Sequence, residues 1–320
     1  MRPTIKISGQ SLSVPGLMNL LVVYLVWSST YLAIRIAVRP GSGFTPFALG
    51  ASRMLIAGLI LLGLAYWKKQ RIIPTAAELS RLAASGIFLW LGGNGLVIWA
   101  EQVADSSFTA LMVSSAPIAA AVINAVIAHR LPSLRLMGAL LLGFGGLGIL
   151  AAPSMLKGVS LEFYSSLALC CAPVMWAIGS VLQSRHPLEL SATASSAYQH
   201  LCAFFGFLLA ALVLGEPIPH PTTEALMAWS YLVLFGSVLS FTSYISSLRL
   251  LPIHIAMTYA YVNPVIALFL GWYFLDEPVT TWTLIGAALV VLGVMGVFRQ
   301  KNHQQRKEVP KSLCETVNTR

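Results

Sequence analysis

Two prolines inside apolar segments, each close to polar side chains, mark the places where this sequence could bind a small molecule. Pro264 directly follows an asparagine, and Pro117 lies two residues after a pair of serines. A proline lacks the backbone N–H and crowds the preceding turn, so each should break its helix and free a carbonyl. In lipid, a freed carbonyl needs a partner from the protein or from a water-filled cavity. The candidate substrate-binding residues around these breaks are Asn94, Ser114, Ser115, Tyr261 and Asn263.

A packing role for the same side chains stays open. Hydrogen bonds between membrane helices are common, and each contributes only about 0.6 kcal/mol on average. The five polar groups could therefore bond to one another or to fixed water. A substrate site and a packing role predict different effects of mutation, on solute affinity in the first case and on stability in the second.

Three ionisable side chains lie within or at the edge of apolar segments. Arg53 is about nine residues from a segment end, which places it about 13 Å deep at about 1.5 Å per residue. It could serve a substrate anion, or it could form an ion pair with a carboxylate such as Glu101 or Asp105. Glu101 and His200 are candidates for proton coupling, although a lone histidine is more often a hydrogen-bonded packing residue.

The segments that carry these residues are apolar and long. Hydrophobic residues make up 57% of the 320 positions and charged residues 10%, against about 25% charged in ordinary soluble domains. Runs of about 20 apolar residues predict membrane-spanning helices, so we expect an all-α, multi-pass membrane protein. The ten predicted spans are roughly 16–38, 44–67, 79–101, 106–128, 135–152, 161–183, 192–214, 225–248, 253–275 and 280–298.

The two halves of the chain repeat one design. Pro264 lies 147 positions after Pro117, and a glycine pattern in the fifth span returns in the tenth. Five spans per half is an odd number, so the second repeat should enter the membrane from the opposite face. The expected organisation is an N-terminal segment at 1–15, five-helix repeats at 16–152 and 161–298, and a basic tail at 299–320.

Positive charges alternate between the predicted loops. Of the 20 Lys and Arg residues, 16 fall on the side that holds the N-terminus and the tail. Because cytoplasmic loops are enriched in Lys and Arg, we predict that both termini are cytoplasmic and that the protein lies in the inner (plasma) membrane. The net charge of +9 is spread over these loops, which argues against a nucleic-acid partner. The bilayer and a small-molecule substrate are the expected partners, and a homodimer is left open.

No motif for catalysis or for a cofactor survives inspection. The sequence contains no phosphate loop, no zinc-protease motif and no serine nucleophile elbow. A glycine pattern at 143–148 matches a dinucleotide fingerprint but lies inside an apolar span without a preceding strand. The six histidines are scattered without metal-ligand spacing, and the four cysteines form no disulfide framework. We expect neither an enzyme nor a bound cofactor or metal.

Several local motifs resemble those of the EamA-type permeases of the drug/metabolite transporter superfamily, closest to the YedA-like branch. They are Trp27-Ser-Ser-Thr-Tyr31, Arg53-Met-Leu-Ile-Ala57, Gly93-Asn94-Gly95 with Glu101, Tyr259-Ala-Tyr-Val-Asn-Pro264, Gly271 and Glu277-Pro278. The resemblance covers residues 16 to 298 and implies a ten-helix inner-membrane permease with a central cavity. Ser28 departs from it, since the family usually has glycine after the tryptophan.

The resemblance and the duplicated halves together predict a secondary transporter, most often an exporter of amino acids, metabolites or drug-like analogues. Alternating access around the broken helices is the expected mechanism. A proton-coupled antiporter or an importer on the same fold is the alternative within this class. A membrane sensor or scaffold that transports nothing is the alternative from another class.

Overall fold

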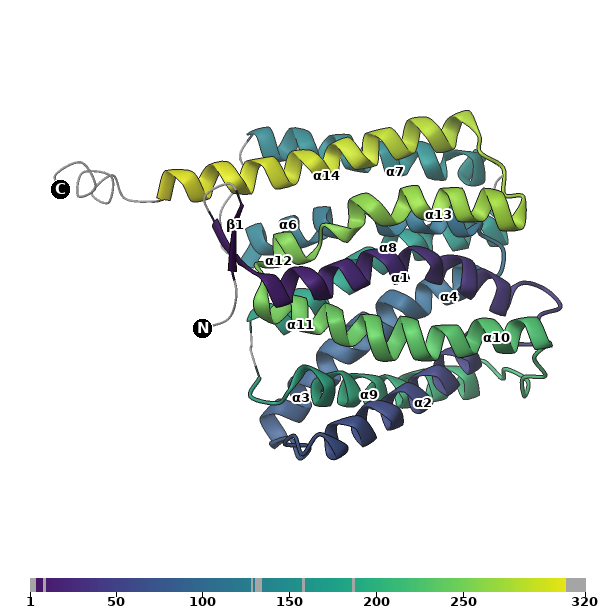
Figure 1. Ribbon diagram of the computed structural model, residues 1–320. Coiled ribbons are helices and arrows are strands. Elements are labelled where there is room, and N and C mark those ends of the chain that lie inside the picture. The colour runs from purple at the N-terminus through teal and green to yellow at the C-terminus, as the bar shows by residue number, and fades with distance from the viewer. Residues whose placement is uncertain are drawn as a thin grey trace.

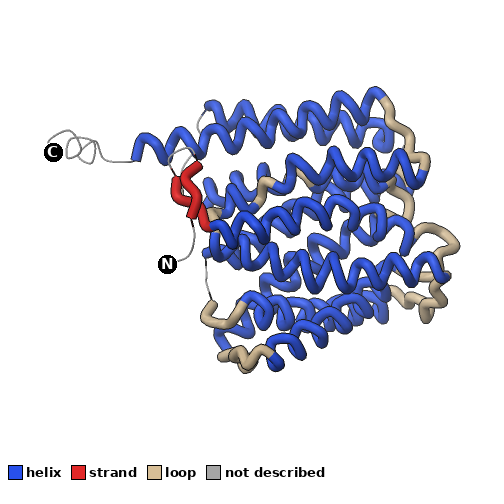
Figure 2. The backbone as a smooth tube through the Cα atoms, viewed as in Figure 1, coloured by secondary structure: helices blue, strands red, loops and turns tan. Residues whose placement is uncertain are grey.

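Long helices, running back and forth through one bundle, make up the computed structural model of the protein (Figures 1 and 2). It describes residues 4–7, 10–127, 129, 134–156, 159–185 and 188–308. The elements are β1 (Thr4–Ile7), β2 (Gln10–Ser13), α1 (Val14–Val38), α2 (Pro46–Trp67), α3 (Ala76–Gly86), η1 (Ile87–Gly95), α4 (Leu96–Ala100), α5 (Ser106–Val113), α6 (Ala116–Ile127), α7 (Leu134–Leu156), α8 (Leu161–Arg185), α9 (Ala192–Val213), α10 (Thr223–Tyr231), η2 (Leu232–Phe241), α11 (Thr242–Leu250), α12 (Ile253–Ala256), α13 (Tyr259–Leu275) and α14 (Thr281–Glu308).

Apart from the connecting loops and a short antiparallel hairpin before α1, the described chain is helical. Strands β1 and β2 pair with Thr4 opposite Ser13 and Ile7 opposite Gln10. Strand β1 alternates polar and apolar residues, which is the two-residue period of a strand. Figure 1 shows this hairpin at the same end of the bundle as the last turns of α14.

Seven helical runs in the described residues are long and apolar enough to cross a membrane. Three shorter apolar helices, Met137–Pro153, Val262–Leu275 and Thr281–Gly296, accompany them. The multi-pass membrane class expected from composition is therefore supported. A helix lies on each of the ten predicted intervals, but ten membrane crossings and their inverted arrangement remain predictions.

Two π-helical segments interrupt the third helical run of each half. Segment η1 continues α3 into α4, and η2 continues α10 into α11. A π-helix has a wider turn than an α-helix and frequently occurs at functional sites. Small residues permit close packing there, because a Cβ on Gly93 would come within 3.0 Å of the Trp176 ring.

Both predicted helix breaks exist, but their positions differ. In the first half, α5 ends at Val113 and α6 begins at Ala116, close to Pro117 as expected. In the second half, the interruption falls at residues 257–258, and Pro264 lies within α13. The expectation of a break at Pro264 itself is therefore wrong. Helix α13 accommodates the missing N–H of Pro264, and the gap between α12 and α13 lies about two turns before this proline.

Helices α7 and α14 form a glycine-lined pair at one side of the bundle, at the top of Figure 1. A Cβ on Gly293 of α14 would lie 2.6 Å from the Cα atom of Gly143 in α7. A Cβ on Gly146 would lie 2.7 Å from the backbone nitrogen of Val290. Glycines on both helices thus allow two backbones to meet, as small residues do between membrane helices.

Candidate functional site

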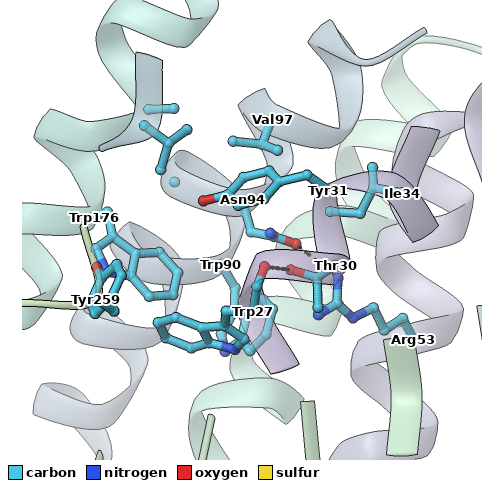
Figure 3. Close-up of a pocket in the computed structure, with 13 residues that line it drawn as sticks. Trp27, Thr30, Tyr31, Ile34, Arg53, Trp90, Asn94, Val97, Trp176 and Tyr259 are labelled. Carbon is cyan, nitrogen blue, oxygen red and sulfur yellow. Dashed lines mark hydrogen bonds between the residues drawn. The ribbon is translucent and has the colours of Figure 1, made fainter. Parts of the chain in front are cut away.

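One cavity lies at the centre of the bundle, between elements of the first and second halves (Figure 3). Its volume is about 50 Å³, which holds a few water molecules in this conformation. Along α1, its wall runs from Trp27, near the helix centre, to Ile34, near the helix end. The lining residues are Trp27, Thr30, Tyr31, Ile34, Arg53, Trp90, Gly93, Asn94, Val97, Val113, Ala172, Trp176 and Tyr259.

Arg53 joins the two π-helical segments across this cavity. Its Nε donates a hydrogen bond to Ser237 Oγ of η2 at 2.8 Å, and its Nη1 donates to Asn94 Oδ1 of η1 at 3.1 Å. The guanidinium also lies 5.0 Å from the centre of the Trp90 ring, a cation–π distance. One side chain of α2 therefore contacts corresponding segments of both halves.

The charge of Arg53 has no carboxylate partner among the described residues. The side chain is only 2% exposed, and the ion pairs found in the described part of the chain involve other arginines, Arg39 with Glu224 and Arg71 with Glu78. A buried cation without a counter-ion carries a large desolvation penalty. Neither Glu101 nor Asp105, the carboxylates considered as partners, forms an ion pair with Arg53 in the described residues.

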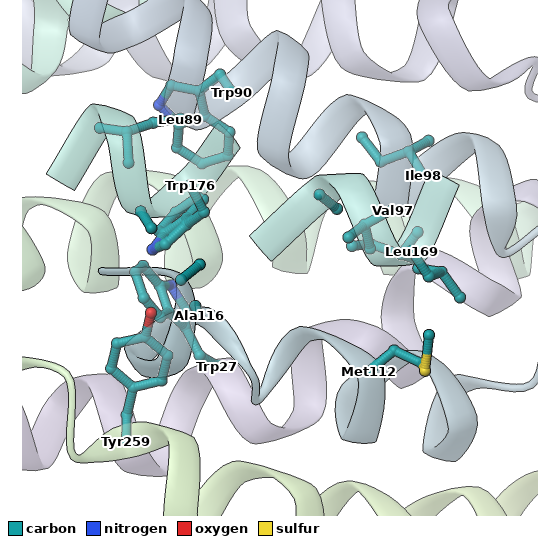
Figure 4. Close-up of a cluster of buried hydrophobic side chains, with 14 of the residues drawn as sticks. Trp27, Leu89, Trp90, Val97, Ile98, Met112, Ala116, Leu169, Trp176 and Tyr259 are labelled. Atoms are coloured by element: carbon teal, nitrogen blue, oxygen red, sulfur yellow. The ribbon is translucent and has the colours of Figure 1, made fainter. Parts of the chain in front are cut away.

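Aromatic side chains close the cavity towards the end of the bundle where α1 begins. The Trp27 ring lies 5.3 Å from Trp176, 4.9 Å from Tyr244 and 5.2 Å from Tyr259, measured between ring centres. Edge-on and tilted contacts of this kind are the favoured aromatic geometries. Figure 4 shows Trp27, Trp176 and Tyr259 gathered from three different helices. We call Trp27, Trp176, Tyr244 and Tyr259 the aromatic plug.

Hydrogen bonds between helices hold the same region together. Ser28 Oγ donates to the carbonyl of Tyr24 at 2.6 Å and lies 3.2 Å from Asn263 Oδ1, and the hydroxyls of Ser180 and Tyr244 lie 2.7 Å apart. Ser28 replaces the glycine usual in the family motif, and its hydroxyl is fully buried in this contact. The departure therefore changes the packing between α1 and α13 and not the wall of the cavity.

Of the predicted substrate-binding residues whose side chains are described, Asn94 lines the cavity and the others do not. Ser114 and Ser115 are buried, and their hydroxyls donate to carbonyls in the preceding turn at 2.6 and 2.8 Å. Asn263 is buried in the contact with Ser28, and its Nδ2 has no hydrogen-bond partner. The side chain of Tyr261 lies outside the described residues.

Glu101 and His200 are both buried away from the cavity lining. Neither carboxylate oxygen of Glu101 forms a hydrogen bond, although its backbone carbonyl accepts one from Arg35 Nη1 at 2.6 Å. His200 Nδ1 lies 2.7 Å from the carbonyl of Ser196, and the ring packs 4.6 Å from Trp90. His200 thus supports the wall of the cavity from behind, as a packing histidine does.

Sequence reasoning missed the aromatic character of the site. It singled out polar groups near prolines, whereas five of the lining residues are aromatic. Their common signal was available, since Trp27, Tyr31, Trp90, Trp176 and Tyr259 all lie within predicted spans and away from the ends where membrane aromatics usually gather. No group of three or more His, Cys, Asp or Glu side chains in the described residues could hold a metal ion.

Comparison with known proteins agrees with this architecture. The inner membrane transporter YedA of Escherichia coli K12, itself uncharacterised, is 29% identical over 285 residues, covering 87% of this chain and 90% of YedA. An S-adenosylmethionine/S-adenosylhomocysteine transporter of Chlamydia trachomatis serovar D is 25% identical, covering 87% of this chain and 88% of the relative. One crystal structure shares the fold with a TM-score of 0.63 at 18% identity, over 88% of this chain and 95% of that one.

The family comparison covers nearly the whole bundle and finds the duplication directly. The EamA-like transporter family matches twice, at residues 14–152 and again at residues 164–299. Each match spans one of the two halves that share the π-helical interruption and the broken helix. The resemblance seen in the sequence motifs is confirmed: the chain belongs to the EamA-like transporter family.

Proposed function

We propose that the protein is a secondary transporter that exports small organic solutes across the inner membrane by alternating access. Its ten helical runs would form two inverted five-helix repeats, at 16–152 and 161–298, with both termini in the cytoplasm. The family matches twice at nearly these positions. The Lys and Arg asymmetry of the loops supports the orientation.

The observation that carries this proposal is a central cavity between the halves that is closed at one end by the aromatic plug. A transporter needs a site that each half can uncover in turn. Arg53 contacts η1 of one half and η2 of the other, so movement of the halves would change its surroundings. In the proposed orientation, the plug separates the cavity from the cytoplasm and would have to open to admit a solute.

Amino acids, metabolites and drug-like analogues are the proposed solutes. The Chlamydia trachomatis relative is named for the transport of S-adenosylmethionine and S-adenosylhomocysteine, which are small organic metabolites. Within the site, Asn94 and Arg53 supply hydrogen bonds and the aromatic rings supply apolar contact. Few polar groups on mostly apolar walls are typical of small-molecule sites.

Proton coupling is a second candidate, and one observation favours it. Glu101 is fully buried with both carboxylate oxygens unpartnered. No ion pair holds this carboxylate in the described residues, and a buried carboxylate without one is costly in its charged form and tends to bind a proton instead. If solute movement is coupled to protons, Glu101 is the group that would carry them. Glu101→Gln should then abolish pH-driven accumulation while leaving solute exchange intact.

The proposed role of Asn263 is distinguishable from packing. In this conformation Asn263 Oδ1 lies 3.2 Å from Ser28 Oγ, and opening of the plug would expose the amide to a solute. A site role predicts that Asn263→Ala weakens apparent solute affinity by about tenfold for each 1.4 kcal/mol lost. Unchanged affinity together with a lowered melting temperature would assign Asn263 to packing alone.

Uptake of a radiolabelled solute library into proteoliposomes tests the function directly. We expect saturable exchange of at least one small organic solute. The absence of exchange for every solute, with correctly folded protein in the bilayer, would favour a sensor or scaffold. The orientation is tested by a cysteine at Lys69, which a membrane-impermeant reagent should label only from the cytoplasmic side.

A further inference from the structure

The lone guanidinium in an aromatic cavity defines the class of solute, provided that the proposed transport function holds. We propose that the solute carries one carboxylate, which pairs with Arg53, and a planar apolar group, which lies against the indole and phenol rings of the cavity. The proposal rests on the charge, the free donor and the walls of this site, which we take in turn.

The charge of the cavity is a single positive one. Among its lining residues, Arg53 is the only one that carries a charge. No carboxylate among the described residues pairs with it. A singly charged anion would neutralise the guanidinium, whereas a phosphate ester would bring up to two negative charges against one cation. The charge balance therefore favours a monocarboxylate.

The guanidinium keeps a donor for this anion. Nε and Nη1 are occupied by Ser237 and Asn94, while Nη2 forms no hydrogen bond with the residues that the structure describes. With Nε and Nη1 already bonded, Nη2 can donate a charge-assisted hydrogen bond to one carboxylate oxygen. Because two neighbours fix the guanidinium, its orientation is set before a solute arrives. Figure 3 shows Arg53 reaching the cavity beside Asn94 and Thr30.

The walls select a flat apolar body. Trp27, Tyr31, Trp90, Trp176 and Tyr259 line the cavity, and aromatic faces pack well against other planar rings. The rings of Trp27 and Trp176 already meet edge to face. The present cavity volume of about 50 Å³ is too small for an aromatic ring. The side chains of the aromatic plug must therefore move apart when the solute binds, and contacts with the solute then replace the contacts that these side chains made with one another.

Three matched probes test the proposal in proteoliposomes that hold the full chain. Indole-3-acetate carries both features, indole-3-acetamide lacks the charge, and cyclohexaneacetate lacks the planar ring. In counterflow and competition assays, we expect the amide and the cyclohexane compound to bind roughly tenfold to a hundredfold more weakly than indole-3-acetate. This comparison needs no variant, so it stands even if changes at Arg53 impair folding.

Variants then locate the effect. Arg53→Gln should remove the preference for the acid over the amide, and Arg53→Lys should keep part of it because the charge remains without the rigid planar guanidinium. Arg39→Gln is the matched control, since Arg39 lies outside the cavity in an exposed pair with Glu224, and it should keep the full preference.

The outcomes separate this inference from the transport function itself. Equal binding of acid and amide, or an unchanged preference in Arg53→Gln, overturns the inference while any observed exchange keeps the transport function. If indole-3-acetate binds more tightly than its amide but no more tightly than cyclohexaneacetate, the proposed planar group of the solute is refuted and the carboxylate remains. Failure to exchange any solute in the library refutes transport, and the substrate class with it.

Discussion

Glu277 offers a perturbation whose effect can be worked out from the structure. Its two carboxylate oxygens accept hydrogen bonds from the backbone nitrogens of Ser106, at 2.7 Å, and Ser107, at 2.9 Å. These N–H groups begin α5 and have no partner within the helix. The side chain is only 5% exposed. Glu277, which follows α13 of the second half, therefore caps a helix of the first half.

The expected loss follows from burial. A negative charge at a helix N-terminus contributes about 0.3–1 kcal/mol at an exposed position and up to about 2 kcal/mol where it is partly buried. Glu277→Gln should therefore lower the free energy of unfolding by about 2 kcal/mol. Glu216 is the matched control, because it accepts from the nitrogens of Phe47 and Ala48 at the start of α2 but is less buried. Glu216→Gln should cost at most about 1 kcal/mol.

A second substitution reaches the same contact from another helix. A Cβ on Gly271 would lie 2.2 Å from Oε2 of Glu277, so Gly271→Ala should push the carboxylate off the α5 terminus. Because both changes destroy one contact, their effects should be far from additive. Unfolding in mixed detergent micelles measures all three variants and the double variant. Equal losses in Glu277→Gln and Glu216→Gln, or additive losses with Gly271→Ala, would refute the reasoning.

Two further predictions concern packing and pH. Gly146→Ala should destabilise the α7–α14 pair by about 1–3 kcal/mol through overpacking. Gly145→Ala should leave the pair unchanged, because a Cβ at Gly145 would meet nothing within 4 Å. Equal melting temperatures of the two variants would contradict this prediction. Burial and the Glu277 carboxylate raise the pKa of Asp105, against the opposing effect of Arg35. A carboxyl group whose pKa is raised in the folded state destabilises the fold at pH values above that pKa, where it must lose its proton. Asp105→Asn should therefore increase the free energy of unfolding at pH 7. This gain should vanish below pH 3.8, the ordinary pKa of the group, where Asp105 is protonated in the folded and the unfolded state alike.

The helices themselves were predictable because hydropathy alone dictates them. Each predicted interval contains a helix in the structure, and α1, α2 and α9 begin and end within two residues of the predicted limits. In a chain that is 57% hydrophobic, an apolar run of about 20 residues has few alternatives to a helix. The recurring glycines were informative in the tenth span only, since Gly286, Gly293 and Gly296 face α7, whereas a Cβ on Gly138, Gly145 or Gly148 would meet nothing within 4 Å.

The break in the second half was harder to place. Proline restricts the residues before it, but a helix can tolerate it with a bend when neighbouring groups satisfy the backbone. Pro264 does remain inside α13, and the interruption falls at residues 257–258. The π-helical segments were also out of reach, because a run such as Ile87–Gly95 has the composition of an ordinary apolar helix with several glycines.

Residues distant in sequence build the site, which explains why single motifs gave only part of it. Arg53 meets Asn94 41 positions later and Ser237 184 positions later. The sequence marked Arg53 as a buried charge but could not choose between an ion pair and a substrate role. The structure supplies two neutral oxygens as neighbours instead of a carboxylate. Neutral neighbours hold the guanidinium in place without cancelling its charge, and an uncancelled buried charge is what a cavity needs to attract an anion from water.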